Sequence, residues 1–122
     1  MLQNTANINC ETAIENCQKC HAVCVETVKN CLEYGGHHAA DGIIKTLQDC
    51  VQICITSADF MSRNSVFHQK LCEICAIICE RCAVNCESLA EGDDFMAECG
   101  KACRKCEESC LEMSNTPEML HG

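Results

Sequence analysis

The stretch LCEICAIICERCAVNC, residues 71–86, decides the fold of this chain. Its cysteines recur at intervals of three or four residues: Cys72, Cys75, Cys79, Cys82 and Cys86. Side chains at this spacing lie on one face of an α-helix, the face that usually carries leucine in a protein core. The stretch therefore predicts a helix that buries a stripe of thiols.

The same spacing continues through the rest of the chain, in which 16 of 122 residues are cysteine. The other members are Cys10, Cys17, Cys20, Cys24, Cys31, Cys50, Cys54, Cys99, Cys103, Cys106 and Cys110. With three phenylalanines, one tyrosine and no tryptophan, the chain lacks the large rings that usually dominate buried area. We therefore expect all sixteen cysteines to face inward and the core to consist largely of sulfur.

Four helical stretches are expected, at approximately residues 9–34, 38–61, 65–90 and 93–114. Gly35 and Gly36 end the first stretch, and Gly92 separates the last two, because glycine suits the end of a helix. Connections this short favour antiparallel neighbours. The prediction is an all-α, up-down-up-down four-helix bundle with a cysteine-lined core, formed as a single domain over residues 1–122.

Charge and hydropathy exclude several classes of function. A formal net charge of -9, without a basic stripe, argues against nucleic-acid binding, which needs clustered Lys and Arg. The first nine residues lack the basic and apolar segments of a secretory signal, and no stretch has the length of a membrane span. We expect a cytoplasmic protein without a membrane partner. In that reducing compartment, abundant cysteine indicates metal or redox chemistry before structural disulfides.

Thiols three or four residues apart on a helix have Cβ atoms roughly 5–6 Å apart, close enough for one metal ion to bridge them. Soft thiolates select Cu(I), Zn(II) or iron–sulfur clusters. A straight stripe offers neighbouring pairs in series, which suits Cu(I), whereas zinc or a cubane needs four ligands that converge on one point. Exchange of each thiol proton for one Cu(I) also leaves the interior near neutral. The pattern favours many cuprous ions.

Other interpretations of the cysteines remain open at this point. The thiols could be inert packing, a disulfide framework, or the CxxC pair of a redox enzyme, although the CxxC pairs lie inside helices and not at their N-termini. Two CxxxCxxC triplets, which begin at Cys75 and Cys99, match a pattern of some iron–sulfur enzymes. An iron–sulfur electron-transfer protein and a metallothionein-like zinc buffer are the alternative functions.

Histidine and methionine are expected near the ends of the stripes, where they could take up metal and pass it inward. The candidates at one end, near Cys10, are Met61, His68 and Met113; those at the other are His37, His38 and Met96. His21 and His121 are not expected to be ligands.

The run at residues 71–86, the segment ECGKACRKCEESC at residues 98–110 and the His37-His38 pair together resemble the bacterial copper storage proteins, specifically their cytosolic branch. The resemblance covers roughly residues 9–114. It implies a non-catalytic protein that forms a homotetramer of four-helix bundles and holds multiple Cu(I) ions through thiolates, for copper storage or detoxification. It also implies that a more polar end of the bundle admits the metal.

The chain departs from the pattern of that family in two places. The second helical stretch carries only Cys50 and Cys54, with Ile43 and Leu47 earlier on the same face, and the connection between the third and fourth stretches is poor in histidine. These departures predict fewer copper ions at the His37-His38 end.

Overall fold

The computed structural model describes residues 5–115, which form four α-helices and one short 3₁₀ helix. The elements are α1 (Thr5–Tyr34), η1 (Gly36–Ala39), α2 (Asp41–Ser62), α3 (His68–Ser88) and α4 (Asp94–Asn115). No strand occurs within residues 5–115. The all-α prediction is confirmed.

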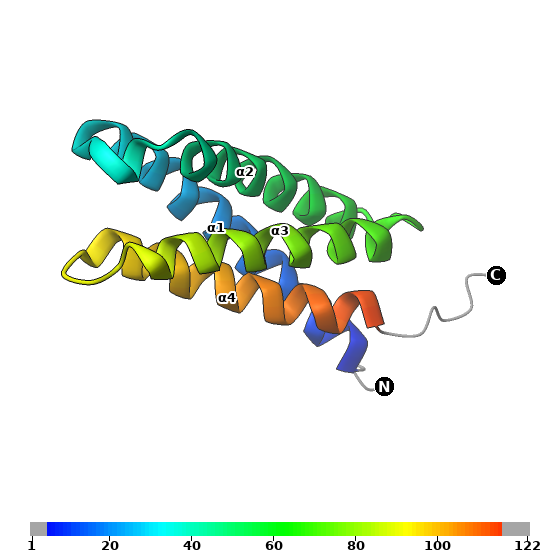
Figure 1. Ribbon diagram of the computed structural model, residues 1–122. Helices are drawn as coiled ribbons and strands as arrows, with labels where there is room; N and C mark the ends of the chain where they lie inside the picture. The colour runs from blue at the N-terminus through cyan, green and yellow to red at the C-terminus, as the bar shows by residue number, and fades with distance from the viewer. Residues whose placement is uncertain (1–4, 116–122) are drawn as a thin grey trace.

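The helices run alternately up and down along one common axis (Figure 1). Each helix packs against its neighbour in sequence, and α1 also packs against α4, which closes the ring. The connections α1–α2 and α3–α4 lie together at one end of the bundle, and the α2–α3 connection lies at the opposite end (Figure 1). The predicted up-down-up-down bundle is confirmed.

The helix bounds differ from expectation at the connections. Residues 36–39 form η1, so α2 begins at Asp41 and not at residue 38. The cause is local backbone geometry: Gly35 and Gly36 have positive φ angles of 79° and 59°, and Ala40 is extended, with ψ at 146°. Such a series of non-helical conformations interrupts the hydrogen-bond ladder of a helix.

The third helix is shorter than predicted, and the first is longer. Asn64 has a φ of 52°, and Ser65 Oγ accepts the Phe67 N–H at 3.1 Å, so the turn continues until α3 begins at His68. At its other end α3 stops at Ser88, where the Leu89 N–H bonds back to the Cys86 carbonyl. The first helix extends back to Thr5.

The two connections at the η1 end are joined by a buried hydrogen bond between His38 and Asp93. His38 Nε2 donates to Asp93 Oδ2 at 2.6 Å, and these side chains are only 10% and 8% exposed. Asp93 Oδ1 accepts the Met96 N–H at 3.4 Å, the position of an N-cap on α4. The rings of Tyr34 and Phe95 flank His38, at centroid distances of 4.1 and 5.9 Å. We call this end of the bundle the His38 end and the opposite one the Cys10 end.

The interior is built from thiols, as predicted. Fifteen of the sixteen cysteines have no exposed surface, and Cys10 is partly exposed. The remaining core side chains are mostly alanine or methionine, together with Leu47. Since cysteine is short, the helices fill this interior with atoms that also have ligand chemistry.

We predict that Asp93→Ala lowers the free energy of unfolding of the metal-free protein by about 2–3 kcal/mol, because it removes an N-cap and leaves buried His38 without its partner. Urea unfolding followed by circular dichroism measures the change. Asp94→Ala is the matched control: Asp94 is exposed in the first turn of α4, and its loss costs less than about 1 kcal/mol. Equal losses for the two variants would contradict the role given to the pair.

Candidate metal centre

Sulfur atoms from different helices touch along the whole interior. Cys17 Sγ lies 3.6 Å from Cys110 Sγ, between α1 and α4, and Cys24 Sγ lies 3.7 Å from Cys99 Sγ. Cys50 and Cys79 join α2 to α3 at 3.8 Å. All sixteen cysteines are free thiols. The structure therefore contradicts the disulfide framework, one of the interpretations that the sequence left open.

Twelve of these thiols form five groups, in each of which four sulfur atoms lie within 4.8 Å of one another. From the His38 end to the Cys10 end, the groups are Cys24, Cys82, Cys99 and Cys103; Cys20, Cys24, Cys50 and Cys103; Cys20, Cys50, Cys54 and Cys79; Cys54, Cys75, Cys79 and Cys106; and Cys17, Cys75, Cys106 and Cys110. Every member is buried. We call these twelve cysteines the thiol row.

Successive groups of the thiol row share two cysteines. The first and second groups share Cys24 and Cys103, and the second and third share Cys20 and Cys50. The third and fourth groups share Cys54 and Cys79, and the fourth and fifth share Cys75 and Cys106. The row is therefore one continuous array of sulfur, in which neighbouring sites have an edge in common.

This array corrects one step of the sequence reasoning, which expected pairs in series and no convergent sets of four. Each group draws on three helices, so convergence comes from facing helices and cannot be seen in the spacing along one of them. Four sulfurs within 4.8 Å of one another could hold a tetrahedral ion, zinc included. Geometry of a single group does not distinguish zinc from Cu(I).

The edges shared between successive four-thiol groups do distinguish Zn(II) from Cu(I). Two tetrahedral ions with metal–sulfur bonds of ~2.3 Å and a common edge lie only about 2.7 Å apart. At that separation two divalent ions repel each other about four times as strongly as two univalent ions. A fully occupied row therefore favours a univalent soft ion.

Four cysteines lie outside the five groups, two towards each end. Cys31 and Cys86 lie towards the His38 end, where Cys31 Sγ is 3.6 Å from Met96 Sδ. Cys10 lies near the start of α1 and Cys72 near the start of α3, at the opposite end. Cys72 interacts with Cys110, a member of the last group, and Cys10 interacts electrostatically with Cys72. These four thiols continue the row beyond its last groups.

The predicted histidine and methionine candidates lie near the two ends of the bundle, but they differ in exposure and in the contacts they make. His37 is exposed on η1, whereas His38 is held by Asp93, and His68 Nδ1 lies 2.7 Å from the Ser65 carbonyl. The methionines Met61, Met96 and Met113 are buried. His21, not expected to be a ligand, contacts the Val51 carbonyl at 2.8 Å, and His121 lies outside the described residues.

Burial favours the protonated form of the thiols in the metal-free protein, whereas hydrogen bonds from neighbouring thiols lower the pKa of four of them, Cys20, Cys50, Cys75 and Cys99. Burial raises the pKa of Cys31 to about 11. Hydrogen bonding with Cys110, followed by burial, raises the pKa of Cys72, and hydrogen bonding with Cys106 and neighbouring thiols raises that of Cys54. No Lys or Arg is buried among the described residues, so no fixed cation compensates thiolates there. A cation must enter if the thiols are to ionise.

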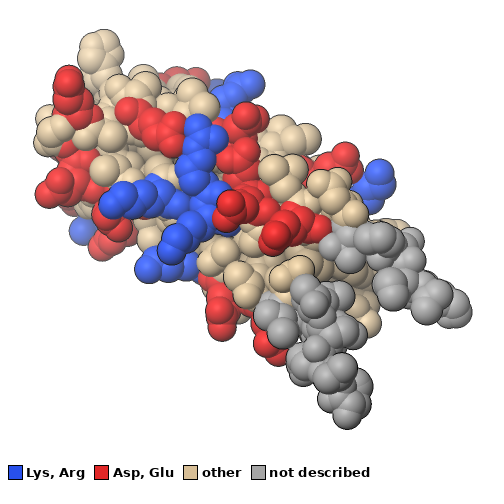
Figure 2. All heavy atoms as spheres, turned by 90° about the horizontal axis from the view of Figure 1, so that it is seen from below, with Lys and Arg blue, Asp and Glu red and all other residues tan. Residues whose placement is uncertain are grey.

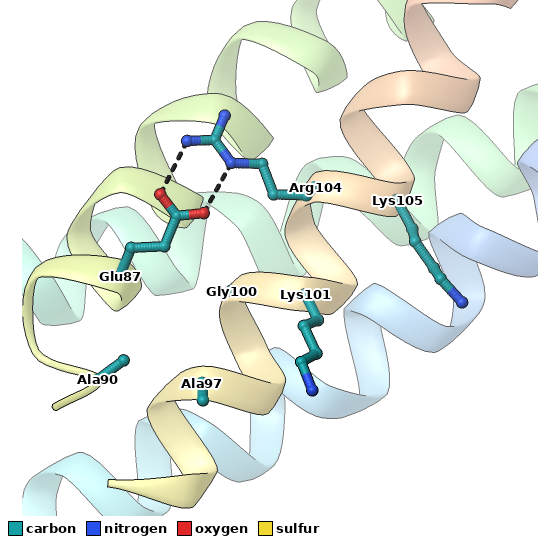
Figure 3. A pocket seen from close by; sticks show the side chains of 7 residues that line it. All are labelled: Glu87, Ala90, Ala97, Gly100, Lys101, Arg104 and Lys105. Carbon is teal, nitrogen blue, oxygen red and sulfur yellow. Dashed lines mark hydrogen bonds and ion pairs between the residues drawn. The ribbon is translucent and has the colours of Figure 1, made fainter. Parts of the chain in front are cut away.

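Among residues 5–115, the groups of potential metal ligands all belong to the thiol row, and none lies on the exterior. On one face, Lys and Arg gather near the middle with Asp and Glu on both sides (Figure 2). A surface groove of about 460 Å³ between α3 and α4 contains no cysteine, and Glu87 and Arg104 meet beside it in a two-bond ion pair of 2.8 Å each (Figure 3). Within the described part of the chain, no helix is both long enough and apolar enough to cross a membrane.

The raised thiol pKa values predict that the metal-free protein loses stability in alkaline solution. An unfolded thiol ionises near pH 8.5, whereas Cys31 keeps its proton until about pH 11. Between these values the unfolded state has released protons that the folded state retains, so the free energy of unfolding falls as pH rises. Anaerobic urea unfolding at pH 7, 9 and 10.5 measures this fall; an unchanged midpoint would contradict it.

Comparison with known proteins agrees with the architecture of the site. A family model described as copper storage protein matches residues 6–115. The Nmul_A1745 protein of Nitrosospira multiformis is 38% identical, with a TM-score of 0.83, over 88% of this chain and 96% of that one. No curated protein matches significantly.

Two further similar structures are described as copper storage proteins. Cu(I)-bound BsCsp3, from Bacillus, is 33% identical, with a TM-score of 0.80, over 87% of this chain and 98% of that one. A cytosolic copper storage protein from Streptomyces lividans, with five coppers, is 26% identical, with a TM-score of 0.83, over 93% and 98%. Matched over nearly all its described residues, and with thiols filling its interior, this chain belongs to the copper storage protein family.

Proposed function

We propose that this protein stores multiple Cu(I) ions inside its helix bundle, bound by the thiolates of its cysteines. The continuous thiol row carries this proposal, because it supplies many soft ligands at bridging distance in one enclosed volume. The ligands are the twelve cysteines of the row with Cys10, Cys31, Cys72 and Cys86 at its ends. The similar Bacillus protein, with Cu(I) bound, supports the choice of metal.

Charge balance supports the same choice. Each bound Cu(I) replaces one thiol proton, so the interior remains near neutral while the number of ions approaches the number of thiols. Zn(II) at the same ratio would add one uncompensated positive charge per ion. Isolated four-thiol zinc sites would avoid the excess, but then only three of the five groups can be filled with no cysteine shared between them.

A storage role without catalysis fits the buried position of these groups. Fifteen thiols have no exposed surface, and the remaining one is only partly exposed, so no substrate larger than an ion reaches the row. We place the protein in the cytoplasm, where Cu(I) and free thiols are both stable to oxidation. Support comes from the Streptomyces relative, described as cytosolic.

We also propose that the bundle assembles as a homotetramer. The outer face of α3 carries three apolar side chains at helical spacing, Ile74, Ile77 and Val84, which are 46%, 63% and 49% exposed. We call them the α3 stripe. A row of exposed aliphatic side chains on a charged protein indicates a surface for another copy.

The test of storage is an anaerobic titration of the reduced protein with Cu(I) against a chelator that forms a coloured Cu(I) complex. We expect tight binding on the order of one ion per thiol, because two- and three-coordinate sites can share sulfur atoms. Saturation at three ions, the number of the four-thiol groups that can be filled without sharing a cysteine, would contradict the proposal. An iron–sulfur protein would instead show colour and a paramagnetic signal on reduction, and a zinc buffer would prefer Zn(II) over Cu(I) in competition.

Two double variants test the ligands in the same titration. Cys20→Ala with Cys50→Ala removes an edge shared by two groups in the middle of the row, whereas Cys31→Ala with Cys86→Ala removes two thiols outside the groups. Both pairs are buried, so their packing losses are comparable. We expect the first variant to lose more ions than the second. Equal losses would show that sharing of edges does not determine capacity.

The α3 stripe is tested by Ile77→Asp, which should lower the mass of the particle in light scattering coupled to gel filtration. A buried aspartate in an interface between copies would leave its charge desolvated. Val66→Asp is the control, since Val66 is 61% exposed on the α2–α3 connection, outside the stripe. A tetramer that persists with Ile77→Asp would exclude the α3 stripe as the interface.

A further inference from the structure

We propose that the thiol row also binds trivalent arsenic, which arrives as the uncharged hydroxide As(OH)₃ and is held by three thiols that form a triangle. This inference goes beyond the proposed copper storage, although it uses the same cysteines. It follows from the arrangement of the contacts between sulfur atoms and from the charge that three thiolates carry.

The contacts between thiols close four triangles among the described residues. The first joins Cys20 and Cys24 of α1 to Cys103 of α4, with sides of 3.8–3.9 Å; we call it the Cys20 triangle. The other three all contain Cys54, and their sides also measure 3.8–3.9 Å: Cys50, Cys54 and Cys79; Cys54, Cys75 and Cys79; and Cys54, Cys75 and Cys106. At most two of the four triangles can therefore be filled without a shared cysteine.

The size of each triangle matches one central atom. Its centre lies about 2.2 Å from each sulfur, close to the ~2.3 Å length of a bond between zinc and a thiolate. Arsenic(III) bonds to three sulfurs in a trigonal pyramid, because its remaining electron pair occupies the fourth position. It therefore sits above the plane of the triangle and draws the three sulfurs slightly inward, which small rotations about their χ1 bonds allow.

The charge of a triangle selects the valence of the atom that it holds. Three thiolates carry three negative charges, of which a univalent ion compensates one and a divalent ion two. No Lys or Arg is buried among the described residues to compensate the remainder. A trivalent atom leaves the triangle neutral. Hard trivalent ions prefer oxygen ligands, so thiols favour a soft one such as arsenic.

Binding is an exchange of ligands without a change of oxidation state. Three arsenic–sulfur bonds replace the three arsenic–oxygen bonds, and each thiol proton leaves with one hydroxide as water. One As(OH)₃ and three thiols therefore give one neutral trithiolate and three water molecules. Where one of the three sulfurs is already ionised, its hydroxide leaves as the anion, and the trithiolate is again neutral. The buried interior gains no net charge, which it would be costly to desolvate.

The acidic exterior also favours an uncharged species over an oxyanion. The formal net charge of -9 repels anions such as phosphate. As(OH)₃ is uncharged at neutral pH and is not repelled. Its approach therefore needs no basic patch on the surface.

The test is an anaerobic titration of the full-length, reduced protein with arsenite at neutral pH, followed by native mass spectrometry. We expect two arsenic atoms per chain, one in the Cys20 triangle and one in a triangle that contains Cys54. The mass should show that each arsenic has replaced three hydrogen atoms and retains no hydroxide. That readout distinguishes a trithiolate from arsenic held by two thiols.

Two matched variants locate the bound arsenic. Cys54→Ala removes the cysteine common to three triangles and leaves the Cys20 triangle, whereas Cys31 contacts the Met96 thioether and belongs to none of the four. Both cysteines are fully buried, so their packing losses are comparable. We expect Cys54→Ala to bind one arsenic and Cys31→Ala to bind two. Cys54→Ser, which nearly keeps the size of the side chain, should also bind one.

Three results would overturn the inference. The first is wild-type protein that binds no arsenic, and the second is bound arsenic that retains a hydroxide. The third is loss of arsenic from Cys31→Ala but not from the Cys54 variants, which would place the sites outside the triangles. Failure of copper storage is distinguishable, because a Cu(I) titration of the same protein would then show few bound ions, whatever the arsenic content.

Discussion

Contact between sulfur atoms of facing helices holds this interior together, since thiols replace the branched side chains that fill most helix bundles. The contacts measure 3.6–3.9 Å, a distance at which neutral thiols pack against one another. Nearly the same separation places two sulfurs on one metal ion. The folded, metal-free protein therefore has its ligands already in position, and binding needs little rearrangement of the backbone.

Much of the fold could be predicted because the decisive pattern is local. Steps of three and four residues, such as Cys79 to Cys82 to Cys86, fix which face of a helix turns inward, whatever the rest of the chain does. The offset of one helix along its neighbour cannot be predicted from this local pattern. It depends on turns such as that at Asn64 and on the extended Ala40, and a shift of one helical turn would pair other thiols. The five groups could not be foreseen from spacing alone.

His38 illustrates the same limit at the candidate site. Two adjacent histidines in a connection carry no periodicity that tells which one faces inward, and the partner of His38 lies 55 residues further along the chain. The sequence predicted both histidines as candidate ligands, whereas in the structure His38 bonds to Asp93 and so joins two connections. The signal that could have indicated this role is Asp93, an N-cap candidate at the start of the last helix.

The edges shared within the thiol row have a consequence for how ions are distributed in a partly filled bundle. An ion bound in one group already touches two sulfurs of the next, so it can shift along the axis by exchanging one bond at a time without leaving the protein. The bound ions are then distributed over the whole thiol row and are not fixed at separate sites. A half-filled bundle is a mixture of interconverting arrangements, whose entropy favours spreading of the ions along the axis.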